Sequence, residues 1–147
     1  MSSQETTAKA LGQLLADSYT LYLKTHNYHW NVRGPMFTTL HTLFEVEYTE
    51  LALAVDEIAE RIRALGFPAP ATYREFSAMT KIVEPTGPVK ATDMITDLGN
   101  DQDTIVAAAK ALFQAAEDAG DPASADLAVR RMETHQKNAW MLRSHLE

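Results

Sequence analysis

Apolar residues recur at helical spacing in four long segments of the chain, and no segment alternates as a strand would. The first segment covers about residues 6–32, and its stripe turns from apolar to polar on one face: Leu11, Leu15, Tyr19, Tyr22, His26, His29 and Trp30. The second covers about residues 36–65 and is apolar along one side: Leu40, Leu43, Phe44, Leu51, Ala54, Val55, Ile58 and Ile62. Gly34 and Pro35 separate the two, because glycine tolerates left-handed geometry and proline disfavours helical dihedrals before it. So short a turn predicts an antiparallel hairpin.

A long crossover follows and leads to a second hairpin. Residues 66–92 hold four prolines, and the middle of this segment, TYREFSAMTKI, predicts a short helix with three buried positions: Phe76, Met79 and Ile82. A third long helix is predicted from Thr92, as its N-cap, to about residue 119. The Gly-Asp-Pro run at 120–122 supplies a helix stop, a capping aspartate and a first-turn proline. The fourth helix then extends to about residue 146, with an apolar stripe: Ala128, Met132, Ala139, Leu142 and Leu146.

These segments predict an all-α protein with a single domain over residues 1–147 and a short N-terminal tail at about residues 1–6. Two hairpins joined by one long crossover describe a four-helix bundle of ferritin-like connectivity, with a short helix between the second and third long helices.

Composition limits the classes of function. No apolar run approaches the roughly 20 residues of a membrane span, and the N-terminal residues lack the layout of a secretory signal, so we expect a soluble, cytoplasmic protein. Without cysteine, metal ligands must be imidazole, carboxylate or backbone groups. A formal net charge of −7, from 13 basic and 20 acidic residues, disfavours a phosphate-binding surface and favours cations as ligands.

The candidate chemistry lies near the first turn. Ferritin-like bundles often hold two irons through a Glu-x-x-His pair on each of two helices, but no glutamate here has a histidine three residues later. What remains is His29 and His41, on either side of the turn, and Asp56 and Glu60, which lie four residues apart on one helical face. Imidazole with carboxylate suits iron, manganese or zinc.

Helix geometry separates these donors. In an antiparallel hairpin His29 and His41 lie roughly 8 and 9 Å from the turn, almost level, so they can face one cavity. Asp56 and Glu60, however, lie about 22 and 28 Å beyond His41 along the same helix. A second copy of that helix, antiparallel about a twofold axis near residues 48–49, would bring the carboxylates to the histidines. We therefore predict an isologous dimer with two identical sites, each built from two chains.

Simpler interpretations exist for each residue alone. His29 on an apolar face is more often a hydrogen-bonded core histidine, and Asp56 and Glu60 would ordinarily form a solvated surface that pairs with Arg61 and Arg63. The joint arrangement favours the metal site. Three histidines do not match the ligand pattern: His26, His135 and His145. Of these, His135 lies on the apolar stripe of the fourth helix and is predicted to be a core residue.

The stretches HNYHWNVRGPMFTTLHTLFE and VDEIAERIRALG resemble the signature of the Dps family, the mini-ferritins named for DNA protection in starved cells. The motif is H-W-N, twelve residues from the first histidine to the second, fifteen to the aspartate and four to the glutamate. The resemblance extends through FPAPATYREF to the C-terminal AWMLRSHL and so covers nearly the whole chain.

The resemblance implies a hollow homododecamer of four-helix bundles with di-iron ferroxidase sites at twofold interfaces. His29 and His41 would be ligands from one subunit, and Asp56 and Glu60 from its neighbour. Such proteins oxidise Fe²⁺, preferably with hydrogen peroxide, and store the ferric mineral, which protects against oxidative damage. Zinc or manganese would compete for the site.

The resemblance also suggests roles for five other residues. Trp30 resembles an alternative electron donor, although filling the end of the hairpin is an equally good reason for it. Asp126 is the best match to the acidic threefold pores through which iron enters, followed by Asp121 and Glu117, with helix capping and surface charge as the alternative. Glu45 would face the cavity and help nucleate mineral.

The N-terminal segment departs from the DNA-binding members of the family. Those members often carry a mobile basic tail, whereas residues 1–9 offer only Lys9 and the terminal amine against Glu5. We therefore predict weak or absent DNA binding, and nucleoid association is not favoured. The alternatives are a DNA-compacting structural protein with little ferroxidase role, and an oxygenase with a metal pair inside the bundle, which the missing Glu-x-x-His motif disfavours.

Overall fold

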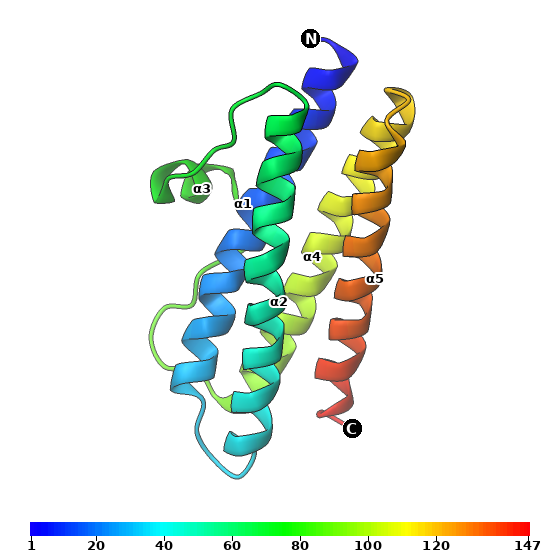
Figure 1. Ribbon diagram of the computed structural model, residues 1–147. Coiled ribbons are helices and arrows are strands. Elements are labelled where there is room, and N and C mark those ends of the chain that lie inside the picture. The colour runs from blue at the N-terminus through cyan, green and yellow to red at the C-terminus, as the bar shows by residue number, and fades with distance from the viewer.

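The computed structural model describes residues 1–147 as four long helices, one short helix and no strand (Figure 1). This confirms the predicted all-α, ferritin-like bundle. The helices are α1 (Ser3–Asn31), α2 (Phe37–Ala64), α3 (Tyr73–Met79), α4 (Ala91–Asp118) and α5 (Pro122–Ser144).

The chain forms two antiparallel hairpins, α1 with α2 and α4 with α5, and α1 packs against α4 between them. Gly34, at φ +105°, makes the first turn, and Gly120, at φ +66°, makes the second. The crossover leaves the end of α2, carries α3 and returns along the length of the bundle to start α4 at the opposite end (Figure 1). The first turn and the beginning of α4 therefore lie at the same end of the molecule.

Two predicted helix starts are corrected. α1 begins at Ser3 because the Ser2 hydroxyl accepts a hydrogen bond of 3.1 Å from the Glu5 backbone N–H, so only the first two residues precede the helix, not the tail predicted at about residues 1–6. Thr92 is not the N-cap of α4. The Met94 N–H already donates to the Lys90 carbonyl at 2.8 Å, so the helix starts two residues earlier than predicted.

The core runs along the inner faces of all four long helices and contains the apolar stripes predicted for them. Phe76 and Ile82 are buried and fasten the crossover to α1, while Met79 is only partly buried. Buried Asp17 adds polar contacts there, because it accepts hydrogen bonds from the Thr80 hydroxyl and the Lys81 N–H. Leu146 was predicted to be buried but is 45% exposed, because α5 ends at Ser144.

None of the helices combines the length and the apolar character that crossing a membrane requires.

Candidate metal centre

His29, in the last turn of α1, and His41, in the second turn of α2, lie side by side across the first hairpin, as their spacing predicted. Their rings stack with centroids 3.7 Å apart and an angle of 14° between the planes. His29 is 5% exposed and His41 is partly buried, so both rings are oriented by the surrounding helices.

Each imidazole is held by the backbone of the other residue. Nδ1 of His29 lies 2.6 Å from the His41 carbonyl oxygen, and Nδ1 of His41 lies 2.7 Å from the His29 carbonyl oxygen. A carbonyl oxygen only accepts, so both Nδ1 atoms must carry the proton. In the neutral form of each ring Nε2 is then the nitrogen with the free lone pair, the form in which histidine binds a metal while a carbonyl orients it from the other side.

Glu45 lies near this pair. Its Oε1 is 3.9 Å from Nε2 of His29, although its side chain is 59% exposed. The predicted nucleation residue is thus one turn beyond His41 and close to the imidazoles. At this distance it supplies negative charge beside the histidines rather than a strong hydrogen bond.

Asp56 and Glu60 lie farther along α2, both exposed and one turn apart. The pairing with Arg61 and Arg63 that a solvated surface would suggest is not formed, since Arg61 bonds Ser124 and Asp121, and Arg63 bonds the Phe67 carbonyl. Within one chain no group of three or more His, Asp or Glu residues lies close enough to hold a metal ion. The chain therefore carries the imidazoles and the carboxylates as separate sets.

Asp56 also contributes to a surface groove of about 630 Å³ between α2 and the α3 segment. The wall of the groove is mostly apolar, with Ala52, Val55 and Ala59 from α2 and Tyr73 and Phe76 from α3. An apolar groove of this kind is a surface that a second protein chain can cover.

A cluster of three further rings lies beside the histidine pair. The His26 ring lies between Trp30, at 3.8 Å between centroids, and Tyr48, at 4.1 Å, and Tyr48 lies 5.1 Å from His29. Trp30 is 61% exposed, so it does not fill the hairpin end as its alternative role required. Burial, with a smaller contribution from the charge of His29, lowers the pKa of His26. The shift favours the neutral form of this ring.

The three candidate pore residues have different surroundings. Asp121 caps α5, accepting from the Ser124 N–H at 3.0 Å and from Arg61 at 2.9 Å. Burial alone would raise the pKa of Asp121, but these hydrogen bonds outweigh it and lower the pKa. Asp126 is exposed and pairs with Arg130 at 3.0 Å, and Glu117 is exposed without an ion pair. The pore assignment of all three stays a prediction.

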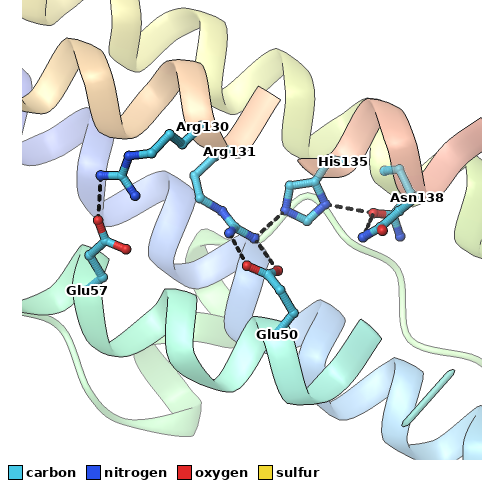
Figure 2. Close-up of polar contacts among 7 residues, drawn as sticks. Glu50, Glu57, Arg130, Arg131, His135 and Asn138 are labelled. Carbon is cyan, nitrogen blue, oxygen red and sulfur yellow. Dashed lines mark hydrogen bonds and ion pairs between the residues drawn. The ribbon is translucent and has the colours of Figure 1, made fainter. Parts of the chain in front are cut away.

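Sequence reasoning missed most of the buried charges. His135 is a fully buried core histidine, as predicted, but its partners, Arg131 and Gln102, were not foreseen (Figure 2). Lys24 is also buried, and it forms ion pairs with Asp97 at 2.9 Å and Asp101 at 2.7 Å. One of the buried charges could have been found from the sequence. Glu47 lies between Phe44 and Leu51 on the apolar stripe of α2, so its position in the stripe indicated burial.

Comparison with known proteins places these features in a family. A model of the ferritin-like domain matches residues 8–147. A DNA protection during starvation protein from Brevibacillus brevis is 37% identical over 99% of this chain and 98% of its own length. DNA protection during starvation protein 2 from Bacillus anthracis is 37% identical over 94% of each chain.

Solved structures agree with the sequence relatives. A Dps protein from Bacillus brevis has a TM-score of 0.97 and 37% identity, covering 100% of this chain and 99% of that one. A Vibrio cholerae Dps protein, described as a member of a broad superfamily of ferritin-like diiron-carboxylate proteins, has a TM-score of 0.94 and 29% identity, covering 99% and 91%. The match to the ferritin-like domain over nearly all of the chain, with full-length Dps relatives above 30% identity, shows that this protein belongs to the Dps branch of the ferritin-like family.

Proposed function

We propose that the protein is a ferroxidase and iron-storage mini-ferritin that acts at sites shared between two subunits. The observation that carries the proposal is the histidine pair, whose two Nδ1 atoms donate to backbone carbonyls and so leave Nε2 of each ring as the nitrogen available to a metal. Two such nitrogens side by side form half of a metal site with its outer hydrogen bonds already made. Membership of a family that includes a described diiron-carboxylate protein supports iron as the metal.

The other half of the site is assigned to Asp56 and Glu60 of a second copy. Both carboxylates are exposed and free of ion pairs within the chain, and Asp56 adjoins the apolar groove that a partner would cover. About 22 Å of helix separates Asp56 from His41 and about 28 Å separates Glu60 from it, so a twofold neighbour is required. We propose that such dimers assemble into a hollow dodecamer in the cytoplasm, with ferric mineral stored inside, and that zinc and manganese compete with iron.

The proposed reaction takes Fe²⁺ and hydrogen peroxide as substrates. Two Fe²⁺ ions each lose one electron, and peroxide takes both electrons with two protons, breaks its O–O bond and leaves as two water molecules. Delivering both electrons together avoids releasing hydroxyl radical. The protein's own part is to bind and orient the ions, with imidazole and carboxylate donors that suit both oxidation states of iron.

The test is removal of the carboxylate half. In the double variant Asp56→Ala, Glu60→Ala we expect Fe²⁺ oxidation by peroxide, followed by stopped-flow absorbance, to slow at least tenfold while the assembly stays intact by size-exclusion chromatography. Glu57→Ala is the matched control, since Glu57 lies on the same helix but pairs with Arg130 at 2.6 Å. Wild-type kinetics in the double variant would refute the shared site.

A further inference from the structure

The interior of the bundle contains a second set of metal-type donors, and it is occupied by an arginine (Figure 2). Arg131 on α5 is 4% exposed. Its two terminal nitrogens donate to the two carboxylate oxygens of Glu50 on α2, at 2.5 and 2.9 Å. The nitrogen that makes the 2.9 Å bond also lies 2.9 Å from Nε2 of His135. One buried cation thus contacts the Glu50 carboxylate, whose side chain is 39% exposed, and the buried His135 imidazole.

His135 is oriented as a metal ligand would be. A guanidinium has no acceptor, so Nε2 of His135 must accept from Arg131, and Nδ1 carries the proton that goes to the Gln102 side-chain oxygen at 2.6 Å. Burial first, and the charge of Arg131 second, lower the pKa of His135 to about 3 and keep the ring neutral. A neutral imidazole that faces a cation and is fixed from behind by an amide oxygen matches the usual pattern at metal sites.

A further buried carboxyl group lies on α2 and has no partner. Glu47 lies one helical turn before Glu50 and is 3% exposed, yet neither of its carboxylate oxygens makes a hydrogen bond. Nε of Arg131 is likewise unpartnered. Two buried groups, the Glu47 carboxyl on α2 and the Arg131 Nε on α5, are thus left without partners, and unmet buried groups of this kind call for an explanation.

We propose that Glu50 and His135 form a cation pocket between α2 and α5 that the Arg131 guanidinium fills, and that Arg131 thereby excludes divalent metal ions from the bundle. In the chain as it stands, no three His, Asp or Glu residues lie close enough to share an ion. Removing the guanidinium leaves the His135 imidazole and the Glu50 carboxylate, with Glu47 one helical turn from Glu50, and imidazole with carboxylate suits Fe²⁺, Co²⁺ or Zn²⁺. This proposal is independent of the activity proposed for the subunit interface.

The experiment removes the Arg131 guanidinium by substitution and then adds a divalent metal ion. Arg131→Met keeps most of the side-chain volume and removes the charge. Arg130→Met is the matched control, since Arg130 is the neighbouring residue but pairs with Glu57 and Asp126 at the surface. Both are made in the Asp56→Ala, Glu60→Ala background, which removes the carboxylates of the proposed interface site. Co²⁺ alone is titrated and followed by its visible absorption and by the thermal midpoint.

We expect Arg131→Met to bind one Co²⁺ per chain at least tenfold more tightly than Arg130→Met, and to be stabilised by Co²⁺ where the control is not. Adding His135→Gln or Glu47→Gln to Arg131→Met should weaken that binding at least tenfold, and Arg131→Lys, which restores a cation, should abolish it. Equal cobalt affinity in the two methionine variants would overturn the proposal. So would an Arg131→Met chain that stays unfolded with and without Co²⁺.

Discussion

The backbone carbonyl of each residue in the pair His29 and His41 accepts a hydrogen bond from Nδ1 of the other, at 2.6 and 2.7 Å. The pairing makes each histidine a positioning group for its neighbour in addition to the metal-binding role proposed for it. In His41→Ala we expect Fe²⁺ oxidation to fall at least tenfold, because one nitrogen ligand is lost and the His29 ring loses its stacking partner. His145→Ala is the control, since that ring bonds only the Met141 carbonyl at the end of α5.

The order of the rings predicts that Trp30 is oxidised when iron is scarce. With one Fe²⁺ per site, peroxide obtains only one electron from iron, and the exposed indole stacked on His26 at 3.8 Å is an available source of the second. We expect the intrinsic fluorescence to fall after peroxide is added under these conditions. The loss should persist in Trp140→Phe and disappear in Trp30→Phe. Trp140 is a suitable control because it is 67% exposed and absent from the stack. Equal losses in both variants would remove Trp30 from this role.

The helices were predictable because their signals are local. Periodicity located the four long helices, and Gly34 and Gly120 marked the two tight turns. The errors were at the helix starts, where a single hydrogen bond determines the first residue of the helix. The Ser2 cap lengthened α1, and the Lys90 carbonyl started α4 ahead of Thr92.

The candidate site was predictable in its placement and not in its detail. Counting residues from the turn predicted that His29 and His41 are level, and the rings are in contact. The reciprocal hydrogen bonds depend on rotamers, which spacing does not determine. The Glu50–Arg131 pair depends on how α2 meets α5, two helices that are far apart in sequence and contact each other little. Such pairings leave no periodic trace in the sequence.

The alternative function, DNA compaction, makes a separate prediction. The chain has a formal net charge of −7, so a shell built from many copies would repel phosphate strongly. We expect no stable complex with duplex DNA in a gel shift at about 0.1 M salt and pH 7. A tight complex under these conditions without iron would favour the alternative of a DNA-compacting structural protein.

Asp121 is predicted to matter chiefly for stability. It caps α5 and pairs with Arg61, so Asp121→Ala removes a cap and leaves the Arg61 guanidinium without its carboxylate partner. We expect a loss of about 1–2 kcal/mol in denaturant unfolding. Asp121→Asn keeps an oxygen for the Ser124 N–H and should lose less. Because the hydrogen bonds lower the pKa of Asp121 in the folded state, its contribution is present above the unfolded pKa near 3.8 and is lost as the pH falls below it.

The buried Glu47 side chain is expected to make the free energy of unfolding depend on pH with the opposite sign. Burial raises its pKa from 4.5 to about 8, so the folded chain holds a proton that the unfolded chain releases above pH 4.5. Because the folded state binds more protons between these values, stability decreases as the pH rises from about 4.5 to 8. The amide of Glu47→Gln has no charge to bury, so this loss of stability does not occur in the variant. Relative to the wild type, the free energy of unfolding of the variant should therefore increase as the pH rises through that range, by on the order of a few kcal/mol at pH 8. Denaturant unfolding at pH 5, 6.5 and 8, at one protein concentration, measures the difference. Glu57→Gln, at an exposed ion pair, should show no such trend, and parallel curves for wild type and Glu47→Gln would mean that Glu47 is ionised in the folded protein.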